Sequence, residues 1–497
     1  MSTAERKKKT ALFWGISWLE LLGIAIMFGW RLLPIPEPMS EAGWQCLGAL
    51  LGVAFIFTTV GPSWGCFVGW LAMAPAAKVL IGGAHGMWSV TTITLGDWLT
   101  VFILVSLLLC YPLKESGFMK RFGYWFMNRS FAKKSPWAFL FSWIIMCFLL
   151  SIIVETDTTA IFFMGVAYTI FERVGFKKGD KFPALMMIGT VFAVMLGYCC
   201  TPIAHGSGYK GLAVYVGLVE NVNDMPLIQY FLITFPVCLL TVIALLLVMR
   251  YIVKPDISRL EGADYSKLLG EKPEPMSKRE KVTVGIYLTV VIFWMLPSFL
   301  SFFPPTAFSN WLNEYTSLGI GLTGLAAMAL VKIDGKPLFN FREAFKSVPW
   351  SVILVMSTTR GLATLLAKPD AGFNAWVTKI LTETIPGMPA FVILAFVCLV
   401  LAITTNFASN TPITVLGVTI LVPQAAVIGI PAPVLATLAT VSAGLALTFP
   451  SGFVLIGYLQ GDEWNLKGTQ MKLGGLGVLL CWILTITLGF GLGMLFF

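Results

Sequence analysis

Apolar stretches as long as a lipid bilayer is thick recur along the whole of this chain. A helix needs about 20 residues to cross the hydrocarbon core of a membrane. Because 57% of the residues are hydrophobic and only 12% are charged, a soluble fold could not cover so much apolar surface. The sequence therefore predicts an all-α, polytopic membrane protein. The apolar windows lie at residues 12–33, 44–63, 64–82, 97–112, 136–171, 184–219, 227–252, 283–303, 313–331, 347–367, 388–425, 431–460 and 471–497.

Four of these windows are interrupted by polar residues, glycine or proline. Non-helical backbone survives at membrane depth only where it is buried in protein or lines a cavity. Windows 136–171 and 388–425 are long enough for two helices each, and we expect re-entrant hairpins that enter and leave the membrane on one side. Windows 184–219 and 431–460 are predicted to be helices unwound at the midplane. This scheme gives about 11 transmembrane helices plus the two hairpins.

The run from Ala402 to Pro423 is the most polar of these interruptions. Pro412 removes a backbone donor and disfavours a helical conformation at the residue before it. Polar groups in hydrocarbon are costly unless they have a role, so we expect this run to surround an ion and a co-transported solute. Contact between neighbouring helices is the alternative, since hydroxyls and amides also bond across membrane helices. The polar residues are Thr404, Thr405, Asn406, Ser409, Asn410, Thr411 and Thr414.

The basic residues indicate an orientation. Lys and Arg are enriched in cytoplasmic loops, and nearly all of them fall into alternate loops if the N-terminus is cytoplasmic and neither hairpin crosses the membrane. This pattern predicts a plasma (inner) membrane protein with an external C-terminus. The basic run at 6–9 and the following apolar window imitate a secretion signal, but the window is long and lacks a cleavage site, so a retained first span is expected. The predicted cytoplasmic segments are 1–11, 113–135, 172–183, 253–282, 332–346 and 461–472.

Two halves of the chain carry related motifs in the same order. Residues Asp157–Gly165 align without a gap on Ser409–Gly417, and His205–Tyr209 align on Phe449–Phe453. The orientation puts the copies on opposite sides of the membrane, which is the inverted repeat of transporters that bind solute near the midplane. The predicted domains are a first transmembrane helix at 1–35, a first repeat at 36–253, a cytoplasmic linker at 254–282 and a second repeat at 283–497.

The tip of the second hairpin carries a family resemblance. With Ser409-Asn410-Thr411 at the tip and Thr405 upstream, the chain resembles the divalent anion/sodium symporter family. The resemblance implies an elevator-type transporter that forms a homodimer and uses sodium as its coupling ion, with no other cofactor. It also implies sodium near Thr405, Ala408 and Asn410, and an anion held by Ser409, Asn410 and Thr411.

The first repeat departs from that family at its own hairpin tip. Asp157-Thr158-Thr159, preceded by Glu155, stands where the family repeats Ser-Asn-Thr. Two like charges about 4 Å apart repel by roughly 4 kcal/mol at an effective dielectric constant near 20, so ionised Asp157 excludes a dianion unless a cation or proton intervenes. Asp157 is expected to bind sodium, to titrate, or to face a neutral or cationic part of the solute. Alternatively, both acids cap the following helix, whose N-terminus favours negative charge.

The candidate binding residues gather at the hairpin tips and the unwound segments. Lys210 is expected to neutralise a substrate carboxylate or to pair with an acid, whereas Arg360 is expected to snorkel or to pair with a carboxylate away from the solute. For His205, a satisfied buried histidine is the alternative to a ligand. The candidate substrate ligands are Asp157, Thr158, Thr159, His205, Ser207, Ser409, Asn410, Thr411, Thr448 and Ser451. The candidate sodium ligands are Glu155, Asp157, Thr158, Gly197, Thr405, Ala408 and Asn410.

These features predict a secondary active transporter, a symporter that moves a small organic anion such as a dicarboxylate or monocarboxylate with sodium by alternating access. The alternative is a proton-coupled carrier or exchanger for a mono-anionic or zwitterionic solute that uses Asp157. An enzyme is disfavoured because no His-Asp pair accompanies Ser207 or Ser409. The 9 cysteines lack CxxC spacing, which disfavours a zinc site. Because the positive charges lie in short loops rather than on one face, no nucleic-acid partner is expected.

Overall fold

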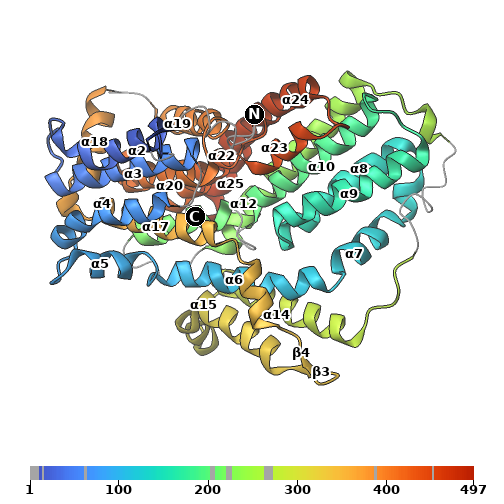
Figure 1. Ribbon diagram of the computed structural model, residues 1–497, viewed down its shortest axis with the longest axis horizontal. Helices are drawn as coiled ribbons and strands as arrows, with labels where there is room; N and C mark the ends of the chain where they lie inside the picture. The colour runs from blue at the N-terminus through green and yellow to red at the C-terminus, as the bar shows by residue number, and fades with distance from the viewer. Residues whose placement is uncertain are drawn as a thin grey trace.

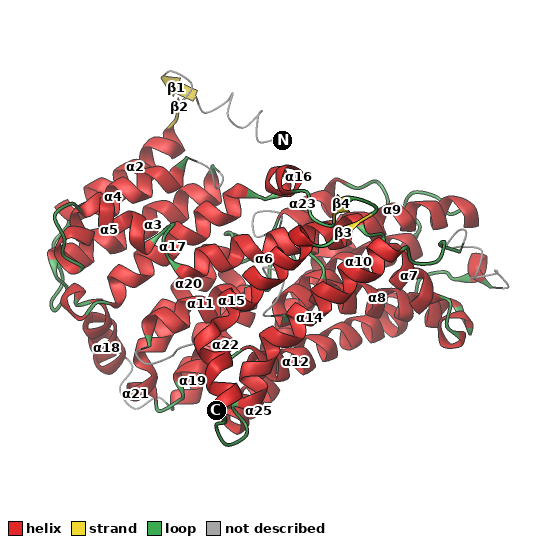
Figure 2. Cartoon of the chain, turned by 90° about the horizontal axis from the view of Figure 1, so that it is seen from below, coloured by secondary structure: helices red, strands yellow, loops and turns green. Residues whose placement is uncertain are grey.

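The protein is built almost entirely of helices (Figure 2). Two pairs of short antiparallel strands accompany them, β1 (Ala11–Phe13) with β2 (Ile16–Ser17) and β3 (Lys332–Ile333) with β4 (Lys336–Pro337). The computed structural model describes residues 11–13, 16–60, 64–201, 207–219, 226–261, 272–384, 389–449 and 453–497.

The helices of the first half precede the linker and those of the second half follow it. The first half contains α2 (Trp18–Gly29), η1 (Trp30–Leu32), α3 (Glu41–Thr59), α4 (Gly65–Leu80), α5 (Gly86–Ile93), α6 (Trp98–Glu115), α7 (Phe118–Met127), η2 (Ser130–Lys133), α8 (Pro136–Ile153), α9 (Thr156–Val174), α10 (Lys181–Cys200), α11 (Ser207–Leu218), α12 (Leu227–Val248) and η3 (Met249–Val253), with η4 (Ser258–Leu260) in the linker. The second half contains α14 (Lys278–Leu300), α15 (Ala307–Leu330), α16 (Phe341–Ser347), α17 (Trp350–Ala367), η5 (Pro369–Ala371), α18 (Phe373–Thr384), α19 (Ala390–Thr404), α20 (Asn410–Leu421), η6 (Val422–Gln424), α21 (Ala425–Ile428), α22 (Ala432–Ala443), α23 (Val454–Gly461), α24 (Lys467–Leu484), η7 (Thr485–Gly489) and α25 (Phe490–Phe496).

Seven helices in the described part of the chain are long and apolar enough to cross a membrane. Five further apolar helices are shorter, with 10–17 residues each. This pattern agrees with the predicted polytopic membrane protein. The seven long helices run over Trp98–Glu115, Pro136–Ile153, Lys181–Cys200, Leu227–Val253, Lys278–Leu300, Asn410–Ile428 and Lys467–Phe496.

The first helix begins later than the apolar window at 12–33 suggests. Helix α2 starts at Trp18 because Ser17 and Glu20 form a capping box. The backbone N–H of Ser17 donates to Glu20 Oε2 over 2.7 Å, and the N–H of Glu20 donates to Ser17 Oγ over 3.3 Å. These bonds satisfy the backbone N–H groups of Ser17 and Glu20 at the start of the helix, so Ser17 marks the boundary of α2.

Both halves contain a helical pair with a sharp break, followed by a helix that is itself interrupted. The first pair, α8 and α9, is interrupted at residues 154–155, and the second pair, α19 and α20, at residues 405–409. Helix α10 ends at Cys200 before α11, and α22 ends at Ala443 before α23. The breaks therefore fall within the windows in which polar residues interrupt the apolar sequence.

The broken helix ends do not leave their carbonyl groups without partners. At the end of α10, Tyr230 Oη donates to the carbonyl of Cys199 over 2.6 Å, and Thr234 Oγ1 donates to that of Cys200 over 2.9 Å. Both side chains come from α12, which packs beside α10. A buried carbonyl that loses its helical donor needs such a replacement, so α12 stabilises the break.

Three apolar cores hold the helices together. One core joins α6–α10 with α12 and α14, a second joins α2–α5 with α17, and a third joins α11 with α19, α20 and α22. In Figure 1, α2–α5 lie at one end of the molecule and α7–α10 at the other, with α20 and α22 between them. The two chain breaks of the second half therefore lie near the middle of the protein.

Candidate functional site

Oxygen atoms from the two breaks of the second half converge on Thr405. Its Oγ1 lies 2.7 Å from Asn410 Oδ1 and 2.6 Å from the carbonyl oxygen of Ala443. The amide of Asn410 also donates to the carbonyl of Gly444 over 3.3 Å. A threonine hydroxyl carries a single proton, so it cannot donate to both close oxygens at once. A buried group of oxygens with too few protons is an arrangement that accommodates a small cation.

Asn406 fixes the second hairpin tip against the unwound segment that follows α22. Its Nδ2 donates to the carbonyls of Ala402 over 2.7 Å and Leu445 over 2.9 Å. Its Oδ1 accepts from the N–H and the hydroxyl of Thr448, at 2.9 and 2.5 Å. The hydroxyl of Thr448, a predicted substrate ligand, is thus engaged by Asn406. These four bonds make the tip and the unwound segment one rigid unit.

A small cavity of about 180 Å³ opens beside the Ser409-Asn410-Thr411 motif. Ser409 holds the N-cap position of α20, and a helix N-terminus attracts anions because its first N–H groups lack helical partners. Ligand pockets of proteins commonly measure roughly 300–1,000 Å³, so this cavity favours a small solute. Tyr198, Lys210 and Phe453 also line it, together with Phe57, Ser351, Val355 and Val454.

Lys210 supplies the cation of this cavity. It lies in α11 and is buried, and its Nζ donates to Tyr198 Oη over 2.7 Å and to Thr411 Oγ1 over 3.2 Å. A charged side chain at membrane depth is costly and indicates a functional site. Lys210 was expected to pair with a carboxylate, but the contact with Tyr198 had no signal in the sequence. The ammonium group and the start of α20 thus bring positive charge to the same cavity.

The first hairpin tip is organised around Glu155. Its carboxylate lies 2.5 Å from Lys114 Nζ at the end of α6 and accepts a hydrogen bond from the hydroxyl of Thr158. The hydroxyl of Thr159 donates to the carbonyl of Glu155 over 2.8 Å. Glu155 holds the N-cap position of α9, but its side chain makes no capping bond there and instead pairs with Lys114 of α6 and with Thr158.

Asp157 differs from its neighbours. Its Oδ1 is buried and has no hydrogen-bond partner among the described residues. The charges of Glu155, Lys114 and Lys210 act on it. A buried carboxylate oxygen without a donor is expensive unless a proton or cation joins it. Asp157 thus has the chemistry of a cation-binding or proton-binding group, close enough to Lys210 for the two charges to interact.

The remaining predicted ligands lie near helix ends or outside the described residues. His205 and Ser451 lie outside the described residues, and Ser207 begins α11. The carbonyl of Gly197 accepts from the N–H of Thr201 over 3.2 Å, and the N–H of Ala408 donates to Thr404 over 3.0 Å. Gly197 therefore lies in the last turn of α10, and Ala408 lies in the interruption between α19 and α20.

Arg360 lies apart from the cavity. It is buried on α17, with its Nε 3.3 Å from Asp97 Oδ2 at the start of α6. A Cβ atom added at Gly217 of α11 would overlap the guanidinium group, so the arginine fills the space beside that glycine. Arg360 therefore pairs with a carboxylate, which is one of its two expected roles.

The amino-acid sequence matches the family described as CitMHS, citrate transporter, over residues 8–443. The chain belongs to the CitMHS citrate transporter family. Proteins of this family are described as transporters, which act on small molecules within a lipid bilayer.

Two further comparisons give a relative in sequence and a similar fold. This CitMHS chain is 22% identical over 302 residues to the uncharacterized transporter MJ0672 of Methanocaldococcus jannaschii, a match that covers 60% of this chain and 62% of the relative, which is less than two thirds of its length. The fold is similar to that of MtrF of Neisseria gonorrhoeae, described as illuminating a class of antimetabolite efflux pumps, with a TM-score of 0.54 over 98% of this chain and 97% of MtrF. At 11% identity, the second likeness shows the fold alone.

Proposed function

We propose that this CitMHS family member is a symporter that moves a small organic anion, such as a dicarboxylate or monocarboxylate, together with sodium. The observation that carries the proposal is the cavity in which Lys210 meets Thr411 at the start of α20. A buried ammonium group and a helix N-terminus both favour a carboxylate. The small volume of the cavity favours a solute of few atoms.

The oxygen cluster around Thr405 supports sodium as the coupling ion. In transporters with broken helices, unwound carbonyls and helix C-terminal ends coordinate the coupling ion beside the substrate. Here the carbonyl of Ala443 ends α22, and Asn410 belongs both to the cluster and to the cavity. An ion bound at Thr405 would fix the orientation of Asn410 and thereby the shape of the solute site, which couples the two ligands.

Alternating access of the elevator type is part of the proposal. The cavity is lined by Lys210 of α11 and Thr411 of α20, two helices of one apolar core, and by Phe57 and Val355, which belong to another core. A site where two packed bodies meet can open to either side when one body slides past the other. The proposal also includes about 11 spans of bilayer length, two re-entrant hairpins, a cytoplasmic N-terminus and a homodimer, as the divalent anion/sodium symporter resemblance implies.

Replacing sodium by choline is the direct test of coupling. Purified protein in liposomes is expected to accumulate radiolabelled citrate, succinate or acetate only when sodium is present outside. An inward sodium gradient should drive accumulation above the external concentration, since the ion and the solute move together. Uptake that continues unchanged in choline would remove sodium from the mechanism while leaving the anion site intact.

Asp157 favours one alternative, a proton-coupled carrier or exchanger for a mono-anionic or zwitterionic solute. Its Oδ1 has no hydrogen-bond partner among the described residues, and a proton would satisfy it as well as a sodium ion would. In this case the proton gradient would drive uptake, and the oxygen cluster around Thr405 would be structural.

Asp157→Asn separates the two mechanisms. If Asp157 binds sodium, the variant is expected to need about tenfold more sodium for half-maximal uptake, which corresponds to a loss of about 1.4 kcal/mol. If Asp157 titrates, the variant should keep its sodium dependence and lose its response to a pH gradient. Glu172→Gln, at the exposed far end of the same helix, is the control and should change neither property.

A further inference from the structure

Two cavities adjoin each other between α7, the linker and the first helical pair, one lined mostly by polar residues and the other mostly by apolar residues. The polar cavity has a volume of about 350 Å³ and the apolar cavity about 270 Å³. Tyr124 and Pro273 line both of them, so the two form one continuous groove. This groove is separate from the solute cavity, because the two share no lining residue.

The polar part of the groove carries an excess of positive charge. Arg121, Arg129 and Lys272 line it against a single carboxylate, that of Glu274. Arg121 donates from Nε to Glu280 over 2.5 Å, and its terminal nitrogens have no partner among the described residues. The guanidinium of Arg129 lies 4.3 Å from the centre of the Trp125 ring. Arg129 and Lys272 make no ion pair within the described chain, so both charges are available to an anion.

The apolar part of the groove lies against the first helical pair. It is lined by Trp143 and Met146 of α8 and by Phe162, Phe163 and Val166 of α9. Trp143, Met146 and Phe163 are buried, so the half-buried Phe162 and Val166 offer most of the carbon surface that a hydrocarbon chain could contact. A ligand that occupied both parts would need a negatively charged end and an apolar tail.

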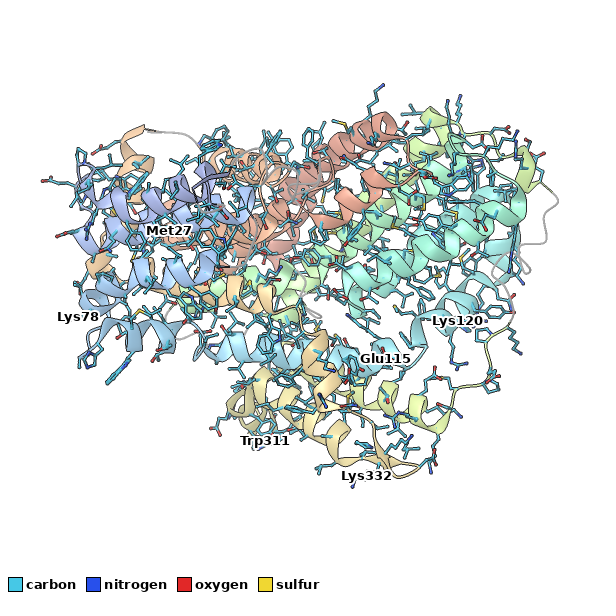
Figure 3. The ribbon with its side chains drawn as sticks, in the orientation of Figure 1. Met27, Lys78, Glu115, Lys120, Trp311 and Lys332 are labelled. Atoms are coloured by element: carbon cyan, nitrogen blue, oxygen red, sulfur yellow. The ribbon has the colours of Figure 1, made fainter. Side chains whose placement is uncertain are left out.

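The residues around this groove are of the kinds found at a membrane boundary. The side chain of Trp125 is 52% exposed and that of Phe131 is 45% exposed, and Arg250 lies 5.8 Å from the centre of the Trp137 ring. Aromatic residues beside Arg and Lys are typical of the layer between hydrocarbon and lipid head groups. Lys120 of α7, which is labelled in Figure 3, adds a further positive charge at the apolar cavity.

We propose that this groove binds an anionic phospholipid. The phosphate would lie between Arg121, Arg129 and Lys272, where arginine can bind it through two N–H groups, and the first part of an acyl chain would lie against Phe162 and Val166. Such a lipid would join the linker, α7 and the first helical pair. Anionic lipid is therefore expected to stabilise the full-length protein.

The test compares lipids and charges in parallel. Phosphatidylglycerol added to the full-length protein in detergent is expected to raise the unfolding temperature by several degrees and to remain bound in native mass spectrometry. Phosphatidylcholine and inorganic phosphate should do neither at the same concentration. The double variant Arg129→Gln/Lys272→Gln should lose most of the shift in unfolding temperature. Lys272→Gln alone should lose a smaller part of it, and because the side chain of Lys272 is exposed, this variant is expected to fold normally.

The control variant removes the same charge elsewhere. Lys332→Gln/Lys336→Gln changes two exposed lysines of the β3–β4 hairpin, and it should keep the full response to phosphatidylglycerol. Three results would overturn the proposal: equal stabilisation by phosphatidylcholine, equal stabilisation by inorganic phosphate, or a groove variant that responds as the control does. Each readout is independent of sodium and of the transported solute. A failure of the lipid proposal can therefore be distinguished from a failure of the proposed transport mechanism.

Discussion

Lys210→Gln is expected to abolish uptake of a carboxylate solute, with a loss of about 10²- to 10³-fold at low solute concentration. Truncating one partner of a buried charge pair costs roughly 3–5 kcal/mol, and each 1.4 kcal/mol is about a factor of ten in affinity. Glutamine can still bond to Tyr198 or Thr411, but it cannot neutralise a carboxylate. Radiolabelled uptake into liposomes measures the effect.

A structural explanation for that loss must be excluded, because Lys210 also offsets the charge of Asp157. The double variant Asp157→Asn/Lys210→Gln removes both charges from the same region. If Lys210 only balances Asp157, the double variant should regain uptake. If Lys210 binds the solute, the double variant should regain thermal stability while uptake stays absent. Restored uptake would contradict the proposed role of Lys210.

The positions of the chain breaks could be predicted from the sequence because their signals are local. The polar run marks the interruption between α19 and α20, and Thr201-Pro202 marks the end of α10. Both signals consist of polar groups in a stretch that is otherwise apolar. Such a contrast needs no knowledge of which segments lie side by side. The prediction that Pro412 breaks the helix just after Thr411 is wrong in position, because Pro412 lies in the first turn of α20, where its missing N–H would have no helical partner.

The contacts across the site could not be predicted in the same way. Lys210 and Thr411 stand 201 residues apart in the chain, and only the packing of α11 on α20 brings them together. The sequence shows that Asn406 is polar, yet three of its four bonds are to Leu445 and Thr448 and depend on the path of the unwound segment after α22. Glu155 illustrates the same limit, since its partner Lys114 lies at the end of a different helix.

Thr405→Val is expected to raise the sodium concentration needed for half-maximal uptake by about 10- to 100-fold. Valine keeps the shape of threonine but removes the oxygen between Asn410 Oδ1 and the carbonyl of Ala443. A buried polar group that loses its partner costs roughly 1–3 kcal/mol, so the ion would lose one ligand and find the other two less well placed. Uptake measured over a series of sodium concentrations gives the shift.

Thr404→Val is the matched control for that substitution. The hydroxyl of Thr404 donates over 2.6 Å to the carbonyl of Val400 within its own helix, so it takes no part in the oxygen cluster. Sodium should raise the unfolding temperature of the wild type and of Thr404→Val alike, since a ligand that binds only the folded state stabilises it by mass action. In Thr405→Val the same rise should need more sodium. A Thr405→Val protein that is less stable without sodium, yet responds to sodium as the wild type does, would make the cluster structural and move the coupling ion to Asp157.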